Sequence, residues 1–290
     1  MWGGSLPATK LALDSFGPFT LAAARLLLAS ALFLVVLRPA ALWRLPRGDA
    51  LKMAGLGVIG CAGVQALQAL GTAQTSAATA TVLASTSPLW IAVLAPVFLR
   101  EHLRFWPVIG VLLALVGVAA INGLNETGVL AGSLPGNVVV MLSSVAAAIY
   151  TVLGKGLARR YSPIVFVGVS CFGGALASLP LAWWELSSSV LRPTTLGWVL
   201  LAYLGILVTF VGFIIWFWGL RALPAAQAGA LMFLQPLSGL ILAVLILGDQ
   251  PTPAFLVGCG LVLAGVYLAA GGGSWRRAPP AETRSVAADS

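Results

Sequence analysis

Long apolar runs follow one another along almost the entire chain, separated by short stretches that contain Gly, Pro and charged residues. Of the 290 residues, 60% are hydrophobic and only 8% are charged, whereas roughly 25% of the residues of a soluble domain are charged. A chain of this composition cannot cover its outside with polar groups, so its outside must face lipid. The sequence therefore predicts an all-α integral membrane protein that is embedded in the lipid bilayer.

The apolar runs predict ten transmembrane helices, because one span takes about 20 apolar residues and Gly, Pro and charge mark the ends. The first run would cover only about 20 Å of a hydrocarbon core roughly 30 Å thick. Either the true N-terminus therefore lies upstream of Met1, or this first helix is incomplete. The expected spans are residues 1–13, 18–37, 50–71, 76–99, 104–122, 134–154, 163–183, 196–220, 225–247 and 253–270.

The basic residues indicate the orientation of these spans. The chain has 16 Lys and Arg against 8 Asp and Glu, but they fall singly or in pairs between apolar runs, which argues against a nucleic-acid partner. Most of them lie in alternate loops and in the polar tail 271–290, which is the cation bias of cytoplasmic loops. The excess of Arg over Lys, with abundant Ala and Gly, suggests a bacterial genome. We therefore expect a multi-pass protein of the bacterial inner (cell) membrane with both termini in the cytoplasm.

The two halves of the sequence, 1–122 and 134–270, resemble each other. Because each half contains five expected spans, an odd number, the second copy would enter the bilayer upside down relative to the first, a frequent architecture of secondary transporters. The matched residues are mostly Gly and Pro, and the register slips by a few positions between the two sets given next. Lys10, Phe16 and Pro18 align with Lys155, Tyr161 and Pro163, and Gly71, Pro88, Glu101, Gly110 and Gly117 with Gly219, Pro236, Asp249, Gly258 and Gly265.

Several runs of the chain resemble the EamA-like repeats of the drug/metabolite transporter superfamily. They include Trp2 to Gly4, Phe19 to Arg25 and the run from Thr75 through Pro88 to Glu101. The second half contains a similar run from Leu223 to Asp249. The resemblance extends over about residues 1–270. It implies an inner-membrane carrier, and many such carriers export amino acids or other small metabolites. It also implies that the cytoplasmic half of the first helix precedes Trp2.

A carrier needs interrupted helices and a few polar groups that face a cavity near the membrane midplane. Pro88 and Pro236 lie inside apolar runs, so we expect them to kink the fourth and ninth helices. The carbonyls that these kinks free, at Ala84 and Met232, would face the cavity or accept hydrogen bonds from Ser and Thr side chains.

The candidate substrate-binding residues are polar or aromatic. Gln65 and Gln68 share one face of the third helix and should point into the bundle, to bind substrate or to join helices. Aromatic rings could surround an organic solute, although Tyr150, one turn before Lys155, could equally be an interface anchor. The complete set is Gln65, Gln68, Trp90, Tyr150, Phe213, Trp216, Gln227 and Gln235.

Two basic residues lie in or near spans. Arg25 lies well inside the second helix, where a guanidinium should reach toward the surface, meet carbonyl groups or attract an anion. The resemblance places this helix at the periphery, so we favour a structural role for Arg25. Lys10 could pair with Asp14 or, less favourably, bind a substrate carboxylate.

No catalytic, metal or cofactor site is expected. Cys61, Cys171 and Cys259 lie in apolar runs without a CxxC pair, His102 lies in a charged loop, and no Asp or Glu lies inside a span. The sequence therefore favours a secondary carrier of a small organic metabolite, such as an amino acid, that works by export and alternating access. The alternatives are a membrane-embedded enzyme, which would need reactive groups that we do not find, and a non-transporting scaffold.

Overall fold

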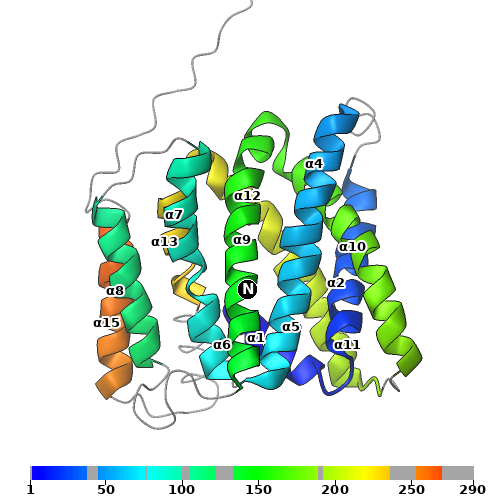
Figure 1. Cartoon of the computed structure of the whole chain (residues 1–290), viewed down its shortest axis with the longest axis horizontal. Coiled ribbons are helices and arrows are strands. Elements are labelled where there is room, and N and C mark those ends of the chain that lie inside the picture. Colours follow the sequence, from blue (N-terminus) through cyan, green and yellow to red (C-terminus); the bar gives the residue numbers. More distant parts are fainter. Residues whose placement is uncertain are drawn as a thin grey trace, which may run out of the picture.

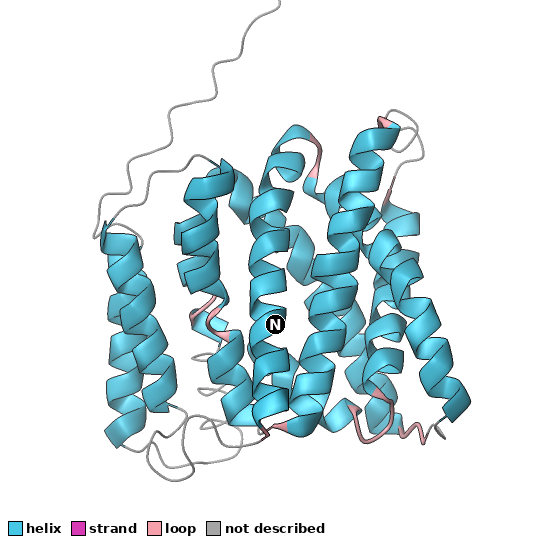
Figure 2. Cartoon of the chain, viewed as in Figure 1, coloured by secondary structure: helices cyan, strands magenta, loops and turns pink. Residues whose placement is uncertain are grey.

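The computed structural model describes residues 2–37, 45–75, 77–99, 105–121, 133–188, 192–235 and 253–269. These residues form helices joined by short turns and loops (Figure 2). In chain order the elements are η1 (Trp2–Gly4), α1 (Ser5–Ala12), α2 (Pro18–Val36), α4 (Arg47–Gly57), η2 (Val58–Gly63), α5 (Val64–Gln74), α6 (Ala77–Ala84), α7 (Ser87–Leu99), α8 (Phe105–Ile121), α9 (Leu134–Arg160), α10 (Pro163–Ser188), α11 (Thr195–Ala202), η3 (Tyr203–Val211), α12 (Gly212–Ala222), α13 (Ala225–Leu231) and α15 (Pro253–Ala269).

Six of the described helices are long and apolar enough to cross a membrane: Pro18–Val36, Arg47–Gln74, Val82–Leu99, Leu134–Arg160, Pro163–Ser187 and Thr195–Ala222. Two more apolar helices, Phe105–Ala120 and Leu256–Ala269, are shorter. The first α-helix, α1, covers only Ser5–Ala12 and follows the short 3-10 turn η1. The predicted ninth span is described only as far as Gln235, and the predicted tail 271–290 lies outside the described residues.

The helices stand roughly side by side, and α8 and α15 form a pair at one edge of the bundle (Figure 1). Glycines allow this pair to approach closely. A Cβ atom on Gly110 would overlap the carbonyl oxygen of Gly265, and a Cβ atom on Gly117 would lie 2.7 Å from the carbonyl oxygen of Gly258. Backbone therefore packs directly on backbone at two heights of the α8–α15 contact.

Two helical rods each contain a π-helical segment. The rod α4–η2–α5 runs without interruption from Arg47 to Gln74, with its π segment at Val58–Gly63. The rod α11–η3–α12 runs from Thr195 to Ala222, with its π segment at Tyr203–Val211. Such segments occur often at functional sites, and both segments contribute residues to the cavity described below.

Two lysines, the half-buried Lys10 and the buried Lys155, each bind the C-terminal end of one of these rods. Lys10 Nζ donates to the carbonyl oxygens of Thr72, at 2.7 Å, and Thr75, at 3.2 Å, and Lys155 Nζ donates to the carbonyl oxygen of Leu223, at 2.7 Å. The last carbonyls of a helix lack partners within the helix and carry partial negative charge, so an ammonium group stabilises them. Lys155 is only 2% exposed.

The helices α9 and α10 extend beyond their predicted ends. The sequence predicts ends at residues 154 and 183, but α9 continues to Arg160 and α10 to Ser188. Charged residues marked the predicted ends, but two of these residues find partners in the fold. Lys155 binds the end of α12, and Glu185 on α10 accepts hydrogen bonds from the backbone N–H groups of Phe19, at 3.3 Å, and Thr20, at 2.7 Å, in the first turn of α2.

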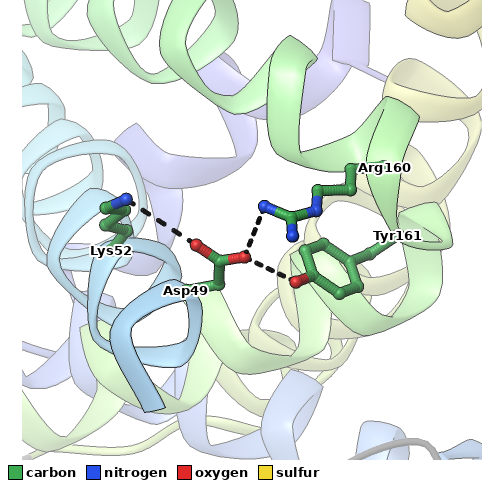
Figure 3. A network of polar contacts seen from close by, with 4 residues as sticks. All are labelled: Asp49, Lys52, Arg160 and Tyr161. Atoms are coloured by element: carbon green, nitrogen blue, oxygen red, sulfur yellow. Dashed lines mark hydrogen bonds and ion pairs between the residues drawn. The ribbon is translucent and has the colours of Figure 1, made fainter. Parts of the chain in front are cut away.

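A network of polar side chains joins α4 to the end of α9 (Figure 3). The Tyr161 hydroxyl donates to Asp49 Oδ2 at 2.5 Å, and Arg160 Nη1 lies 3.0 Å from the same oxygen. Lys52 is 71% exposed and approaches Asp49 Oδ1 only to 3.7 Å. The tyrosine and the arginine therefore make the close contacts in this network.

Candidate functional site

A cavity of about 130 Å³ lies where the two π-containing rods, α2, α9 and the N-terminal segment meet. The ends of two helices, α6 and α13, also reach it. Its lining residues are Trp2, Gly3, Ser5, Leu6, Arg25, Gly60, Val64, Gln65, Gln68, Ala84, Ser85, Ser87, Pro88, Ala147, Tyr150, Thr151, Val208, Phe213, Trp216, Met232, Phe233 and Gln235. This set combines amides, hydroxyls, one guanidinium and several aromatic rings.

The helix that contains Pro88 is interrupted at the cavity. The helix α6 ends at Ala84, a turn follows at Ser85 and Thr86, and α7 begins at Ser87, so Pro88 lies in its first turn (Figure 2). Proline fits there, because the first N–H groups of a helix have no partner within it. The carbonyl oxygen of Ala84 accepts from the Ser87 hydroxyl at 2.8 Å.

The helix α13 ends at the same cavity. After Leu231 the backbone continues in tight turns, in which the N–H groups of Met232, Phe233 and Gln235 donate to the carbonyl oxygens of Gly229, Ala230 and Met232 at 2.9, 3.1 and 3.0 Å. Met232, Phe233 and Gln235 line the cavity. Pro236, the second predicted kink, lies outside the described residues.

Two glutamines on α5 face the cavity. Gln65 and Gln68 are three residues apart, as expected for one helix face, and both line the cavity. Gln65 is 5% exposed. An amide at this depth requires a hydrogen-bonding partner, which a polar solute in the cavity would provide.

Aromatic rings form another part of the lining, which we call the aromatic wall: Trp2, Tyr150, Phe213 and Trp216. The ring centroid of Trp2 lies 5.8 Å from that of Phe213 and 5.6 Å from that of Trp216. The Trp2 indole donates to the carbonyl oxygen of Val208, in η3, at 2.8 Å. Tyr150 is 3% exposed and therefore lies inside the bundle, not at an interface.

The Tyr150 ring is held by its neighbours. It stacks on Phe166, with centroids 5.5 Å apart, and meets the edge of Phe217 at 5.2 Å. A Cβ atom on Gly60, in η2, would overlap this ring. Glycine at position 60 therefore makes the room that the ring occupies beside the cavity.

Two predicted residues do not line the cavity. Trp90 is half-buried and packs against the hydrophobic core. It follows the cavity-lining Pro88 by two residues, about 200° around a helix, and so points elsewhere. Gln227 is half-buried in the first turn of α13, whereas the cavity receives the end of that helix.

Several lining residues were not among the predicted binding residues: Trp2, Arg25, Ser85, Ser87 and Thr151. Arg25 is 4% exposed, so it does not reach toward the membrane surface. The sequence did carry a signal for Arg25, because a lone cation deep in a span is costly and is often functional.

The EamA-like transporter family model matches residues 1–123 and again residues 134–271. The chain belongs to this family. EamA-like proteins are transporters and not enzymes, and this one has multiple apolar helices, as expected of a multi-pass membrane protein. The carrier class indicated by the sequence and the predicted absence of an enzymatic function are thereby confirmed.

Several curated relatives of this EamA-like transporter match it over nearly its whole length. An "Uncharacterized transporter" of Archaeoglobus fulgidus is 29% identical over 92% of this chain and 94% of its own. A "Probable terminal-alkyne amino-acid exporter" of Streptantibioticus cattleyicolor is 30% identical over 92% of this chain and 89% of its own. A "Biotin transporter" of Salmonella typhimurium is 28% identical, but over 63% of this chain and 61% of its own.

A solved crystal structure has the same fold as this EamA-like transporter. Its TM-score is 0.73, and the match covers 92% of this chain and 94% of that chain at 22% sequence identity. At this identity the similarity establishes the arrangement of the helices and not the solute that is carried.

Proposed function

We propose that this EamA-like transporter is a secondary carrier that exports a small organic metabolite, an amino acid or a related compound, by alternating access. The observation that carries the proposal is the cavity at which α6 and α13 both end. Secondary transporters bind solutes near the midplane, at interrupted helices whose free backbone groups face the site. The amides of Gln65 and Gln68 and the aromatic wall would together hold a solute that has a polar and an apolar end.

We further propose that the chain forms ten spans in two inverted five-helix repeats, 1–122 and 134–270. Lys10 and Lys155 align in the sequence, and each binds the C-terminal end of a π-containing rod. The aligned glycines exchange partners, as a twofold axis would require: Gly110 packs on Gly265, and Gly117 on Gly258. The two matches of the family model also divide the chain between these halves.

The same arrangement supports a location in the bacterial inner membrane with both termini in the cytoplasm. An even number of spans places both ends of the chain on one side. The basic residues near the Asp49 network, Lys52, Arg159 and Arg160, would then face the cytoplasm, in agreement with the cation bias of cytoplasmic loops. Labelling of single cysteines at positions 126 and 160 tests this proposal, because they should react from opposite sides of the membrane.

An amino acid is the proposed solute for two reasons. The Streptantibioticus cattleyicolor relative, which aligns over nearly the whole chain, is named as an amino-acid exporter. The cavity also combines polar and aromatic groups within about 130 Å³. Biotin, named for the shorter Salmonella typhimurium match, is the alternative solute to include in a screen.

Reconstitution in liposomes tests the proposed function. Liposomes that contain the protein should exchange at least one labelled amino acid with an unlabelled internal pool, and empty liposomes should not. The variant Gln68→Leu should lower this flux at least tenfold. The matched control is Gln74→Leu, the same change at an exposed position of the same helix, which should transport at the wild-type rate. Failure to move any amino acid or biotin would refute the proposed function.

A further inference from the structure

The guanidinium of Arg25 is buried at the cavity and makes hydrogen bonds only to neutral groups. Arg25 lies on α2, is 4% exposed and lines the cavity. Its Nε and Nη2 atoms donate to Thr209 Oγ1 at 3.2 and 3.1 Å, and Nη2 lies 3.5 Å from the carbonyl oxygen of Leu204. These partners belong to η3 and carry no charge, so they orient the guanidinium but do not neutralise it.

Within the described part of the chain, no carboxylate binds Arg25: its hydrogen bonds go to Thr209 and Leu204, and Asp14 is exposed in the turn after α1. Asp49 pairs with Lys52 and Arg160, and Glu185 accepts from the first turn of α2. Within the same residues, the hydrogen bonds of Arg25 use Nε and Nη2 and leave Nη1 without a partner. A buried charge without an opposite charge is costly in protein and more so in a membrane. An anion that enters the cavity would remove this cost.

We infer that Arg25 binds the carboxylate of the transported solute. The inference rests on the proposed function and names the chemical group that the cavity selects. A guanidinium presents its N–H groups in a planar fork that matches the two oxygens of a carboxylate. Thr209 and Leu204 fix the orientation of that fork before the solute arrives, and the aromatic wall then receives the apolar part of the same molecule.

Probe molecules test this inference on the unaltered protein. The concentration that gives half-maximal thermal stabilisation in detergent is measured for L-phenylalanine, L-leucine, N-acetyl derivatives of both, and their carboxamides. The N-acetyl compounds keep the carboxylate and lose the amine, whereas the carboxamides keep the amine and lose the carboxylate. At least one acid and its N-acetyl derivative should bind at least tenfold more tightly than the matching carboxamide.

Variants then test which residue causes the preference for the acid over the carboxamide. Arg25→Met removes the charge and keeps a similar side-chain length, so it should lower the acid-to-amide ratio to within about twofold of one. Thr209→Val removes the orienting hydroxyl but keeps the charge, so it should preserve most of the preference for the acid. Arg221→Met, at an exposed position in the last turn of α12, removes one positive charge away from the cavity and should leave the ratio unchanged.

The outcomes separate this inference from the proposed function. If an amino acid and its carboxamide bind and cross liposomes equally well, the carrier function stands and the role of Arg25 is refuted. If Arg25→Met does not fold, the comparison of acid and amide on the wild type still decides. If no probe binds and no solute crosses, both proposals are overturned.

Discussion

The Tyr161 hydroxyl donates a hydrogen bond to the Asp49 carboxylate across 2.5 Å, and this contact joins the residue after α9 to the first turn of α4. Arg160 approaches the same oxygen from the side of α9. In the proposed repeat arrangement, Asp49 belongs to the first half and Tyr161 to the second. In that arrangement this contact, drawn in Figure 3, would link the two halves.

Removal of this contact should loosen that end of the bundle. We expect Tyr161→Phe to increase the reaction of a cysteine placed at position 53 or 158 with a water-soluble reagent. Asp49→Asn should have a similar effect, and the two changes together should do little more than either alone, because both delete one interaction. Lys52→Met is the control, since the exposed lysine makes only a long contact. Fully additive effects would contradict a direct link.

The same contact should be insensitive to pH over the physiological range. The Asp49 carboxylate, as the first cause, and desolvation raise the pKa of the Tyr161 hydroxyl above its usual value of 10.0. A tyrosine whose pKa rises on folding stabilises the folded state at every pH below its unfolded pKa of about 10, and this stabilisation is lost only as the pH rises through the folded pKa. The effect of Tyr161→Phe on cysteine labelling should therefore be the same at pH 6 and pH 9. A difference within this range would exclude the protonated hydroxyl as the donor.

A methyl group at position 60 should disturb the Tyr150 side of the cavity. The Cβ atom of Gly60→Ala would overlap a ring that Phe166 and Phe217 hold in place. We expect a loss of stability of about 1–3 kcal/mol from overpacking, seen as a lower melting temperature in detergent, together with reduced flux. Gly55→Ala is the control, because nothing lies within 4 Å of its new methyl group and alanine favours helix. A Gly60→Ala protein as stable as wild type would show that the ring moves freely.

Replacement of Pro88 should impair transport more than folding. Pro88→Ala restores a backbone N–H in the first turn of α7 and permits α6 and α7 to join across Ser85 and Thr86, which removes a turn that lines the cavity. We expect at least a tenfold loss of flux with no loss of melting temperature. Pro96→Ala, in the interior of the same helix and away from the cavity, should transport normally. Wild-type flux for Pro88→Ala would show that the interruption is not required.

The edge pair of helices should separate when a methyl group is added to its close contact. The Cβ atom of Gly110→Ala would overlap backbone of Gly265, which cannot move aside as a flexible side chain could. We expect the melting temperature to fall by several degrees. Gly260→Ala on α15, where nothing lies within 4 Å of the added atom, should melt like the wild type. Equal melting temperatures for both variants would contradict the close approach of α8 and α15.

Features that depend on local sequence could be predicted. Apolar runs locate most of the helices, and the spacing of Gln65 and Gln68 places both on one face, which proves to be the face that lines the cavity. The interruption near Pro88 follows from the chemistry of proline. The ends of helices were harder to predict. Lys155 suggests a loop in the sequence, but in the fold its ammonium group donates a hydrogen bond to the carbonyl oxygen of Leu223, a residue far along the chain.

Features that depend on distant partners could not be predicted. Arg25 belongs to the cavity because η3, almost two hundred positions further along, packs against α2. Trp2 joins the aromatic wall because it reaches Phe213 and Trp216. Trp90, in contrast, was predicted to bind the solute but does not line the cavity. Tryptophan suits a binding site, but the position of Trp90 on α7 directs its side chain against the hydrophobic core. Residue type suggested the chemistry of the site, and packing decided which residues supply it.

The two π-containing rods present unlike surfaces to the cavity. Gln65 and Gln68 on α5 supply amides, whereas Phe213 and Trp216 on α12 supply rings. A solute with a hydrophilic and a lipophilic end would consequently bind in a single preferred orientation. In the reversed orientation its hydrophilic end would lie against the rings of α12 and its lipophilic end against the amides of α5. Isomers in which the order of polar and apolar groups is reversed should therefore be poor transport substrates.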